Sequence, residues 1–204
     1  MSWFGRAWLR MAPLADARGA RAHRQRLVAG LGGTVVEVGA GAGLNFALYP
    51  DAVTRVVALE PDATLRLAAV RAADARVEVL DGVAEALSLG DGEADAVVFS
   101  LVLCSVRDQA VALAEAHRVL RAGGELRFYE HVVATGGIGR LALQAADRSG
   151  VWPALAGGCH PARDTVAAIR ASGFAVDAHE HFTFRAGAVS PPIPHVLGRA
   201  VRVP

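Results

Sequence analysis

The sequence predicts an α/β protein with a doubly wound sheet of seven mostly parallel strands and an antiparallel strand at one edge. Short apolar runs alternate with helical segments from residue 34 to residue 131, which is the pattern of βαβ units. A glycine-rich turn directly follows the first apolar run. Two late apolar runs lie close enough in sequence to pair with each other. These three observations predict a Rossmann-like arrangement.

The elements follow one another in a regular order. Strands are predicted at 34–38, 55–60, 76–80, 94–100 and 123–131, with helices between them at 44–49, 62–73 and 108–121. Pro61 can occupy the first turn of its helix. A last helix at 161–172 ends at Gly173, and the runs Phe174–Ala178 and His181–Ala186 are predicted to form an edge hairpin.

Composition limits the class of protein. With 204 residues, 53% hydrophobic and 20% charged, the chain is expected to form one well-packed domain at residues 31–204. The formal net charge of +1 gives the whole molecule no attraction for nucleic acid. Two cysteines cannot build a disulfide framework, and no signal peptide or spanning apolar run is evident, so we expect a cytoplasmic protein. The sequence leaves the oligomeric state open.

Residues 1–30 are predicted to form a helical segment of different character. Trp3, Phe4, Trp8 and Met11 recur near helical spacing, and six arginines against one aspartate give a local charge of 6 − 1 = +5. A basic amphipathic helix with tryptophans can cover an apolar substrate as a lid or make peripheral contact with a membrane surface. A helix that simply packs on the domain is the third interpretation.

The turn that begins at Gly39 indicates a ligand site. A dinucleotide fingerprint needs a third glycine at the sixth position, where this chain has Leu44. Glu37, two residues before the turn, suits a ligand with a cationic amine and would repel a pyrophosphate. Glu60 ends the second strand, where a carboxylate can accept hydrogen bonds from both ribose hydroxyls. A helix cap at Glu37 and a solvated strand end at Glu60 are the structural alternatives.

These motifs resemble those of the class I S-adenosylmethionine-dependent methyltransferases over almost all of the chain beyond residue 30. The matching segments are the E-x-G-x-G-x-G run Glu37–Gly43, the acid Glu60, the A-E-x-L run Ala84–Leu87 and the turn Arg118–Gly124. The resemblance implies that S-adenosyl-L-methionine is the cofactor and that the enzyme methylates a small molecule.

The same resemblance implies a set of cofactor-binding residues. The methionine part would lie among Glu37, Gly39, Ala40, Gly41 and Asn45. Glu60 would hold the ribose with Pro61 beside it, and the adenine would lie among Asp81, Gly82, Val83 and Ala84. Ser100 and Leu101 would lie near the methyl donor.

A narrower resemblance is to the methyltransferase-like group that includes alkyl-thiol methyltransferases. It rests on the segments Asn45–Pro50, Leu101–Val106, Glu130–Val132, Gly158–His160 and Pro194–Gly198. The chain differs from the membrane-bound animal members in lacking a clear N-terminal hydrophobic anchor. Its motifs also overlap with those of quinone- and lipid-modifying methyltransferases.

His131 is the predicted catalytic residue, because it ends the fifth strand at the edge where such folds bind ligands. A histidine that only orients the loop is the alternative. Glu130 is expected to point to the opposite face and pair with Arg127 or a helix. Cys104 is expected to be a buried small hydrophobe. Cys159 and His160 are adjacent and lack partners at ligand spacing, so no metal is expected.

The acceptor is predicted to be small and mostly apolar. The end of the fourth strand lacks the Asn/Asp-Pro-Pro-aromatic run that resembles base methylation, and a thiol needs less help from a base than a hydroxyl does. A thiol is therefore favoured. The alternatives are O-methylation of a quinone, lipid or secondary metabolite, a non-catalytic S-adenosylmethionine-binding protein and, more remotely, a dinucleotide oxidoreductase.

Overall fold

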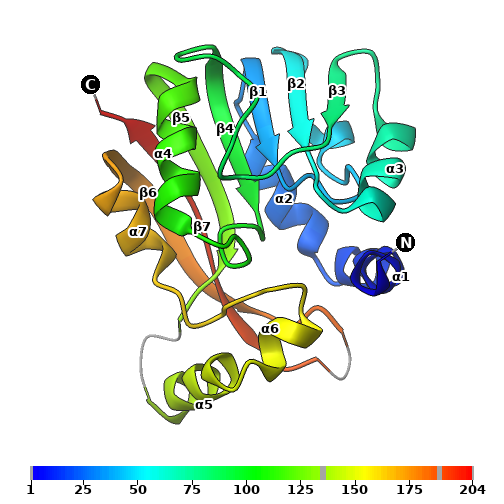
Figure 1. The fold of residues 1–204 in the computed structure, drawn as a ribbon, viewed down its shortest axis with the longest axis vertical. Helices are drawn as coiled ribbons and strands as arrows, with labels where there is room; N and C mark the ends of the chain where they lie inside the picture. Colours follow the sequence, from blue (N-terminus) through cyan, green and yellow to red (C-terminus); the bar gives the residue numbers. More distant parts are fainter. Residues whose placement is uncertain (1, 134–136, 188–189, 204) are drawn as a thin grey trace.

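Seven strands form one sheet in the computed structural model, which describes residues 2–133, 137–187 and 190–203. The strand order is β3-β2-β1-β4-β5-β7-β6 (Figure 1). Their bounds are β1 Gly33–Val38, β2 Val53–Leu59, β3 Val77–Leu80, β4 Ala94–Ser100, β5 Leu120–His131, β6 Phe174–Phe184 and β7 Ile193–Arg202. Neighbours from β3 to β5 pair in parallel, and β7 is antiparallel to both β5 and β6. The predicted fold class is confirmed, with the reversed strand one place inside the edge.

Helices cover both faces of this sheet. Their bounds are α1 Trp3–Asp16, α2 Ala20–Val28, the 3-10 turn η1 Phe46–Leu48, α3 Ala63–Ala72, α4 Gln109–Val119, α5 Gly137–Arg148, α6 Val151–Leu155 and α7 Thr165–Ala171. One apolar core joins α4 and α7 to the sheet, and a second joins α2, η1 and α3 to its opposite face. Because both faces are covered, central strands such as β1 are nearly continuous runs of buried residues.

The order of the strands follows from these apolar runs and their crossovers. β1 lies between β2 and β4, and the three strands are parallel. Their carboxyl ends therefore lie side by side near the centre of the sheet. The chain places β2 and β3 on one side of β1 and then β4 and β5 on the other side, and this change of side makes a crevice outside the carboxyl ends. This is the edge that the sequence pattern predicts as the ligand site.

The last two strands differ from the prediction. Phe174–Ala178 and His181–Ala186 do not form a hairpin, because residues 174–184 belong to the single strand β6 with a shift of register between Val176 and Ala178. β6 instead pairs with β7, a strand that the sequence does not predict. The predicted break at residues 179–180 falls within a run of exposed residues on β6, 177–181, where the apolar pattern of a strand is lost.

The helix predicted at 44–49 is also wrong in extent, because only the 3-10 turn Phe46–Leu48 forms there. Tyr49 is already extended, as expected for the residue before a proline. Pro50 has no N–H to continue a helix. The glycine turn therefore leads into a short loop and not into the N-terminus of a full helix.

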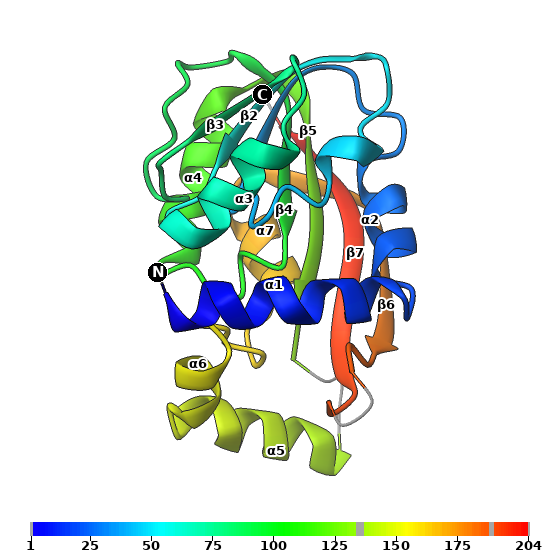
Figure 2. The ribbon, with the colours of Figure 1, turned by 90° about the vertical axis from the view of Figure 1, so that its right-hand side faces the viewer.

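Three helices lie outside the carboxyl edge of the sheet. Figure 2 shows α1 crossing between the sheet and α6, with α5 beyond it. The N-terminal segment contains two helices, because Gly19 adopts a φ of 111° between α1 and α2. Neither α5 nor α6 was predicted. Among the described residues, no helix combines the length and apolar character required to cross a bilayer.

Candidate active site at the carboxyl edge

The glycine turn after β1 needs glycine for two physical reasons. Gly39, Gly41 and Gly43 have φ values of 65°, 59° and 75°, in the left-handed region. A Cβ on Gly39 would lie 2.5 Å from the Val102 side chain, which comes from the loop after β4. The turn therefore brings bare backbone against the end of β4, and the Ala40 N–H donates to the Leu59 carbonyl of β2 at 3.0 Å.

Glu37 is buried under this turn with both carboxylate oxygens bonded. Asn45 Nδ2 donates to Oε1 at 2.8 Å, and the Tyr49 hydroxyl donates to Oε2 at 2.8 Å. Burial raises the pKa of Glu37 to about 7, against the lowering effect of these two hydrogen bonds. Because the amide nitrogen of Asn45 donates to Glu37, the orientation of the amide is fixed. The amide oxygen, Asn45 Oδ1, is then a buried acceptor with no partner among the described residues.

This arrangement changes the role expected for Glu37. The sequence predicts that Glu37 itself faces an ammonium, but its side chain is only 1% exposed and each of its oxygens accepts from a neighbouring side chain, Asn45 or Tyr49. The unpaired acceptor beside the turn is Asn45 Oδ1. A buried polar atom without a partner is rare and suits a donor supplied by a ligand.

Glu60 ties the end of β2 to the glycine turn. Its Oε2 accepts from the Gly41 N–H at 2.7 Å, and its Oε1 accepts from the Asp62 N–H at 2.8 Å. Burial raises the pKa of Glu60, and the two backbone hydrogen bonds oppose that effect. Each carboxylate oxygen has a second acceptor site, so both can still accept from hydroxyl groups. Pro61 lies exposed beside it.

The residues after β3 and β4 complete the edge. Asp81 is exposed and pairs with Arg66 at 3.1 Å, while Gly82 packs on Leu59 so closely that a Cβ would lie 2.4 Å from its side chain. Val83 is exposed and Ala84 buried. The half-buried pair Ser100 and Leu101 follows β4.

Leu101 stands out in backbone conformation. Its φ is 63°, and it is the only described non-glycine residue with a positive φ. A branched side chain in the left-handed region is strained by about 1–2 kcal/mol, and such strain gathers at functional sites. Its N–H donates to the Tyr129 carbonyl at 2.7 Å, which holds the end of β4 against β5.

His131 lies beside two thiols that the sequence did not connect. Its Nδ1 is 3.2 Å from Cys159 Sγ and 3.6 Å from Cys104 Sγ. The expectation that Cys159 lacks partners at ligand distance is therefore wrong, because the partners come from other segments of the chain. Hydrogen bonds from the Cys104 thiol and then from His131 lower the pKa of Cys159, although burial raises it. The catalytic role of His131 stays a prediction.

Glu130 does not pair with Arg127. Its buried carboxylate points to the loop after β4 and accepts from the N–H groups of Val102, Leu103 and Cys104 at 2.9, 3.0 and 3.2 Å. Burial raises the pKa of Glu130 to about 7 despite these three bonds. The alternation of side chains along β5 does not predict this contact, because the loop after β4 covers the Glu130 side chain and supplies the donors.

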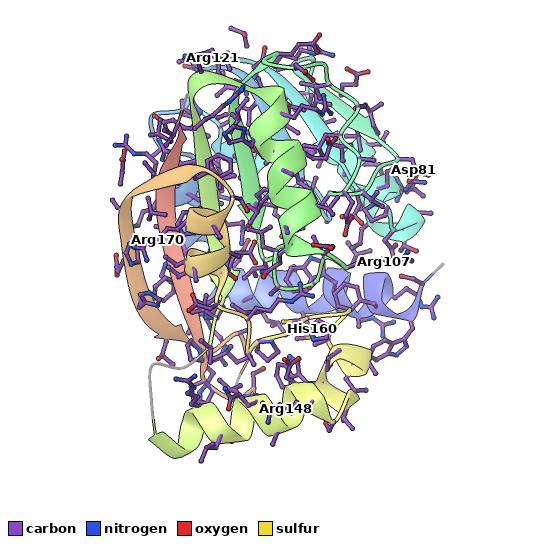
Figure 3. All side chains as sticks on the ribbon, turned by 60° about the vertical axis from the view of Figure 1, so that its left-hand side comes forward. Asp81, Arg107, Arg121, Arg148, His160 and Arg170 are labelled. Atoms are coloured by element: carbon purple, nitrogen blue, oxygen red, sulfur yellow. The ribbon has the colours of Figure 1, made fainter. Side chains whose placement is uncertain are left out.

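His160 and Arg163 support the loops around this site. His160 Nδ1 lies 2.7 Å from Asp147 Oδ1 of α5, and Figure 3 shows it between the sheet and α5. Arg163 Nη1 donates to the carbonyls of Leu103 and Val106, both at 2.8 Å. Arg163 therefore secures the loop after β4.

α1 covers the edge beside the glycine turn. Trp8 Nε1 lies 3.7 Å from the position that a Cβ on Gly41 would occupy. Ser2 caps the helix by accepting from the Gly5 N–H at 2.8 Å, and the Ser2 N–H donates to the Thr64 hydroxyl at 3.1 Å on α3. The opposite surface of α1 exposes Trp3, Met11 and Leu14 to solvent.

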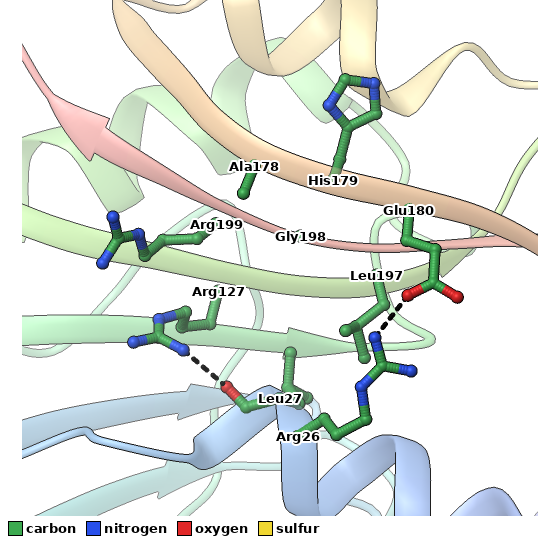
Figure 4. Close-up of a pocket in the computed structure, with 9 residues that line it drawn as sticks. All are labelled: Arg26, Leu27, Arg127, Ala178, His179, Glu180, Leu197, Gly198 and Arg199. Carbon is green, nitrogen blue, oxygen red and sulfur yellow. Dashed lines mark hydrogen bonds and ion pairs between the residues drawn. The ribbon is translucent and has the colours of Figure 1, made fainter.

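A hollow with a volume of about 380 Å³ lies away from this edge, between α2 and strands β6 and β7 (Figure 4). Arg26 lines it in an ion pair with Glu180, and Arg199 pairs with Asp177 at 2.7 Å. Its cations are therefore neutralised, and the hollow offers no chemistry that matches the carboxyl edge.

The chain is similar to known methyltransferases in sequence and fold. The family described as "Methyltransferase domain" matches residues 36–128. Thiol S-methyltransferase TMT1B of Homo sapiens is 32% identical over 180 residues, which are 82% of this chain and 70% of that protein. A geranyl diphosphate methyltransferase solved in complex with SAM superposes with a TM-score of 0.72 at 16% identity, covering 91% of this chain and 85% of that one. The [4+2]-cyclase SpnF superposes with a TM-score of 0.68 at 18% identity, covering 94% and 80%.

The fold, the glycine turn and these similarities define a methyltransferase. The chain belongs to the class I S-adenosylmethionine-dependent methyltransferases, and S-adenosyl-L-methionine is its cofactor. The residues at the edge fit this group, because Asn45 Oδ1 is an unpaired acceptor for an ammonium and Glu60 retains acceptor sites for ribose hydroxyls. Gly39 leaves room where a side chain would clash.

Proposed function

We propose that this enzyme transfers the methyl group of S-adenosylmethionine to the sulfur of a small, mostly apolar thiol. The observation that carries this proposal is the 32% identity, over most of the chain, to a protein named as a thiol S-methyltransferase. Bound S-adenosylmethionine supplies an electrophilic methyl group on a sulfonium.

The chemistry beside β5 supports a thiol acceptor. A hydroxyl acceptor depends on a general base within hydrogen-bond reach. A thiol has a pKa of about 8.5 and is partly ionised near neutral pH, so it needs less assistance from a base. The buried Leu103 and half-buried Val102 give this side of the edge an apolar character.

The residues of the chain act by positioning in this proposal. Asn45 Oδ1 would accept from the ammonium of the methionine part, and Glu60 would accept from the ribose hydroxyls. Leu101, in its left-handed conformation, would fix the end of β4 beside the reacting centre. Such positioning contributes much of the rate of an in-line displacement, because both reactants are held in a reactive geometry.

The test is transfer of a labelled methyl group from S-adenosylmethionine to parallel panels of alkyl thiols, phenols and amines. We expect the labelled product in the thiol panel, with the matching alcohols as unreactive controls. Transfer to phenols in preference to thiols would replace the proposal with O-methylation of a quinone, lipid or secondary metabolite.

A protein that binds S-adenosylmethionine without transferring its methyl group is the second candidate, because this fold does not by itself fix the reaction: SpnF, which is similar in fold, is named as a cyclase. Calorimetry with S-adenosylhomocysteine separates the two. Tight binding of this product without transfer to any member of the three panels would favour the non-catalytic role.

A further inference from the structure

Two thiols and an imidazole meet at the acceptor side of the candidate active site. Cys104 lies in the loop after β4, His131 ends β5, and Cys159 precedes α7. The ligand atoms of these three residues all lie within 4.8 Å of one another. Cys104 and Cys159 are buried, whereas His131 is only half-buried and leaves the group one accessible side.

The distances suit a metal ion with soft ligands. Zinc binds thiolate sulfur at about 2.3 Å and imidazole nitrogen at about 2.0 Å, so neighbouring ligands in a tetrahedron are separated by roughly 3.5 Å. The separations from His131 Nδ1 to Cys159 Sγ and Cys104 Sγ are 3.2 and 3.6 Å. Little movement would be needed to place one ion among the three atoms.

The surrounding backbone holds these ligands in place. Glu130 accepts from the Cys104 N–H at 3.2 Å, and the His160 N–H donates to the Cys104 carbonyl at 2.7 Å. The His131 ring packs edge-to-face on the His195 ring with centroids 4.5 Å apart. Ligands fixed by their own neighbours are typical of metal sites.

We propose that one divalent metal ion such as Zn²⁺ binds to Cys104, His131 and Cys159, and that its fourth coordination position is open for the sulfur of the methyl acceptor. Two thiolates neutralise the charge of the ion, which makes its burial feasible. Three protein ligands with one open position are the arrangement of catalytic zinc sites, whereas structural sites are closed by four. The acceptor part of this inference rests on the proposed thiol methylation, and the metal part does not.

The reaction balances without a further reactant. The acceptor thiol releases its proton to solvent as its sulfur binds the ion. That sulfur then forms a bond to the methyl carbon while the bond from this carbon to the donor sulfonium breaks, and the bonding pair stays on the donor sulfur. The methylated product is a neutral thioether, a weaker ligand than a thiolate, so it leaves the ion.

The metal site is tested first, with Co²⁺ as the spectroscopic probe on reduced, chelator-treated full-length protein. We expect one Co²⁺ per chain, a thiolate-to-cobalt charge-transfer band, and displacement by Zn²⁺. The chain has only two cysteines, so such a band can come from no other residues. Cys104→Ser, Cys159→Ser and His131→Gln should each weaken binding by about 100-fold or more.

The matched control is His181→Gln, which changes an exposed histidine on β6 and should leave Co²⁺ binding intact. Circular dichroism of the metal-free variants separates loss of a ligand from loss of the fold. Absence of the band in the folded wild type would overturn the metal site, as would its retention in the cysteine variants. A Cys104–Cys159 disulfide that forms in preference to the metal complex would do the same.

The open position is tested by adding a small thiol to the Co²⁺-loaded enzyme. We expect the charge-transfer band to shift, and the metal-stripped enzyme to lose at least tenfold in thiol methylation while its affinity for S-adenosylhomocysteine stays unchanged. An unshifted band, or equal methylation without metal, would overturn the acceptor part while the proposed function stands. Metal binding with no methylation of any thiol would instead remove the proposed function.

Discussion

Glu60 contacts two neighbouring segments and keeps acceptor sites for a ligand. It fixes the glycine turn through Gly41 and the start of α3 through Asp62, and it retains the acceptor sites that ribose hydroxyls need. We therefore predict that Glu60→Ala weakens binding of S-adenosylhomocysteine by roughly 1–3 kcal/mol, the value of hydrogen bonds to a charged group. Calorimetry measures this, with exposed Glu78→Ala on β3 as the matched control. Unchanged affinity would refute the ribose assignment.

Asn45 offers the sharper test of the methionine end, because its Oδ1 is buried and unpaired. Asn45→Ala should weaken binding of S-adenosylhomocysteine by about 1–3 kcal/mol through loss of an acceptor for the ammonium. Tyr49→Phe is the control, since it removes the other hydrogen bond to Glu37 but keeps Asn45 Oδ1. Equal losses of affinity in both variants would indicate that the Glu37 network matters only for the fold.

At the scale of elements, α1 places Trp8 beside the glycine turn, so this helix can be tested as a cover of the ligand site. Because the indole lies against Gly41, its fluorescence should change when S-adenosylhomocysteine binds. We predict that Trp8→Phe abolishes most of the change, whereas Trp3→Phe, at a position 58% exposed, preserves it. A signal that survives in Trp8→Phe would place the ligand away from Trp8 and contradict the prediction.

The central elements were predictable because their signals are local. The run before Gly39 is mostly apolar and β-branched, and the turn itself requires glycine. The distal elements were harder to predict, because most residues of β6 are exposed and the burial pattern of β7 does not alternate regularly. The helix α5 contacts mainly α6. The Cys104, His131 and Cys159 group was hidden for a different reason: spacing along the chain carries no information about segments that the sheet brings together.

At the scale of the whole molecule, buried titratable groups make stability depend on pH. The folded-state pKa values of Glu37 and Glu130 are both raised to about 7, so the folded chain binds more protons than the unfolded chain between about pH 4.5 and 7. The contribution of these two groups to the free energy of unfolding is fully present below their unfolded-state pKa and is lost as the pH rises through 7. His195 opposes this, because burial lowers its pKa to about 3 and its contribution is lost as the pH falls from 6.5.

The Glu130 contribution can be isolated by mutation in the metal-free protein. A rise of the pKa from 4.5 to about 7 corresponds to roughly 3 kcal/mol between the two ends of this pH range. We predict that the stability advantage of wild type over Glu130→Gln shrinks by up to that amount between about pH 5 and pH 8, because wild type must then bury a charge that the amide lacks. Urea unfolding at pH steps across this range measures it, and Glu78→Gln, which loses only an exposed ion pair with Arg55, should show a constant difference from wild type. Parallel curves for wild type and Glu130→Gln would mean that the three backbone N–H groups of the loop after β4 keep Glu130 ionised throughout.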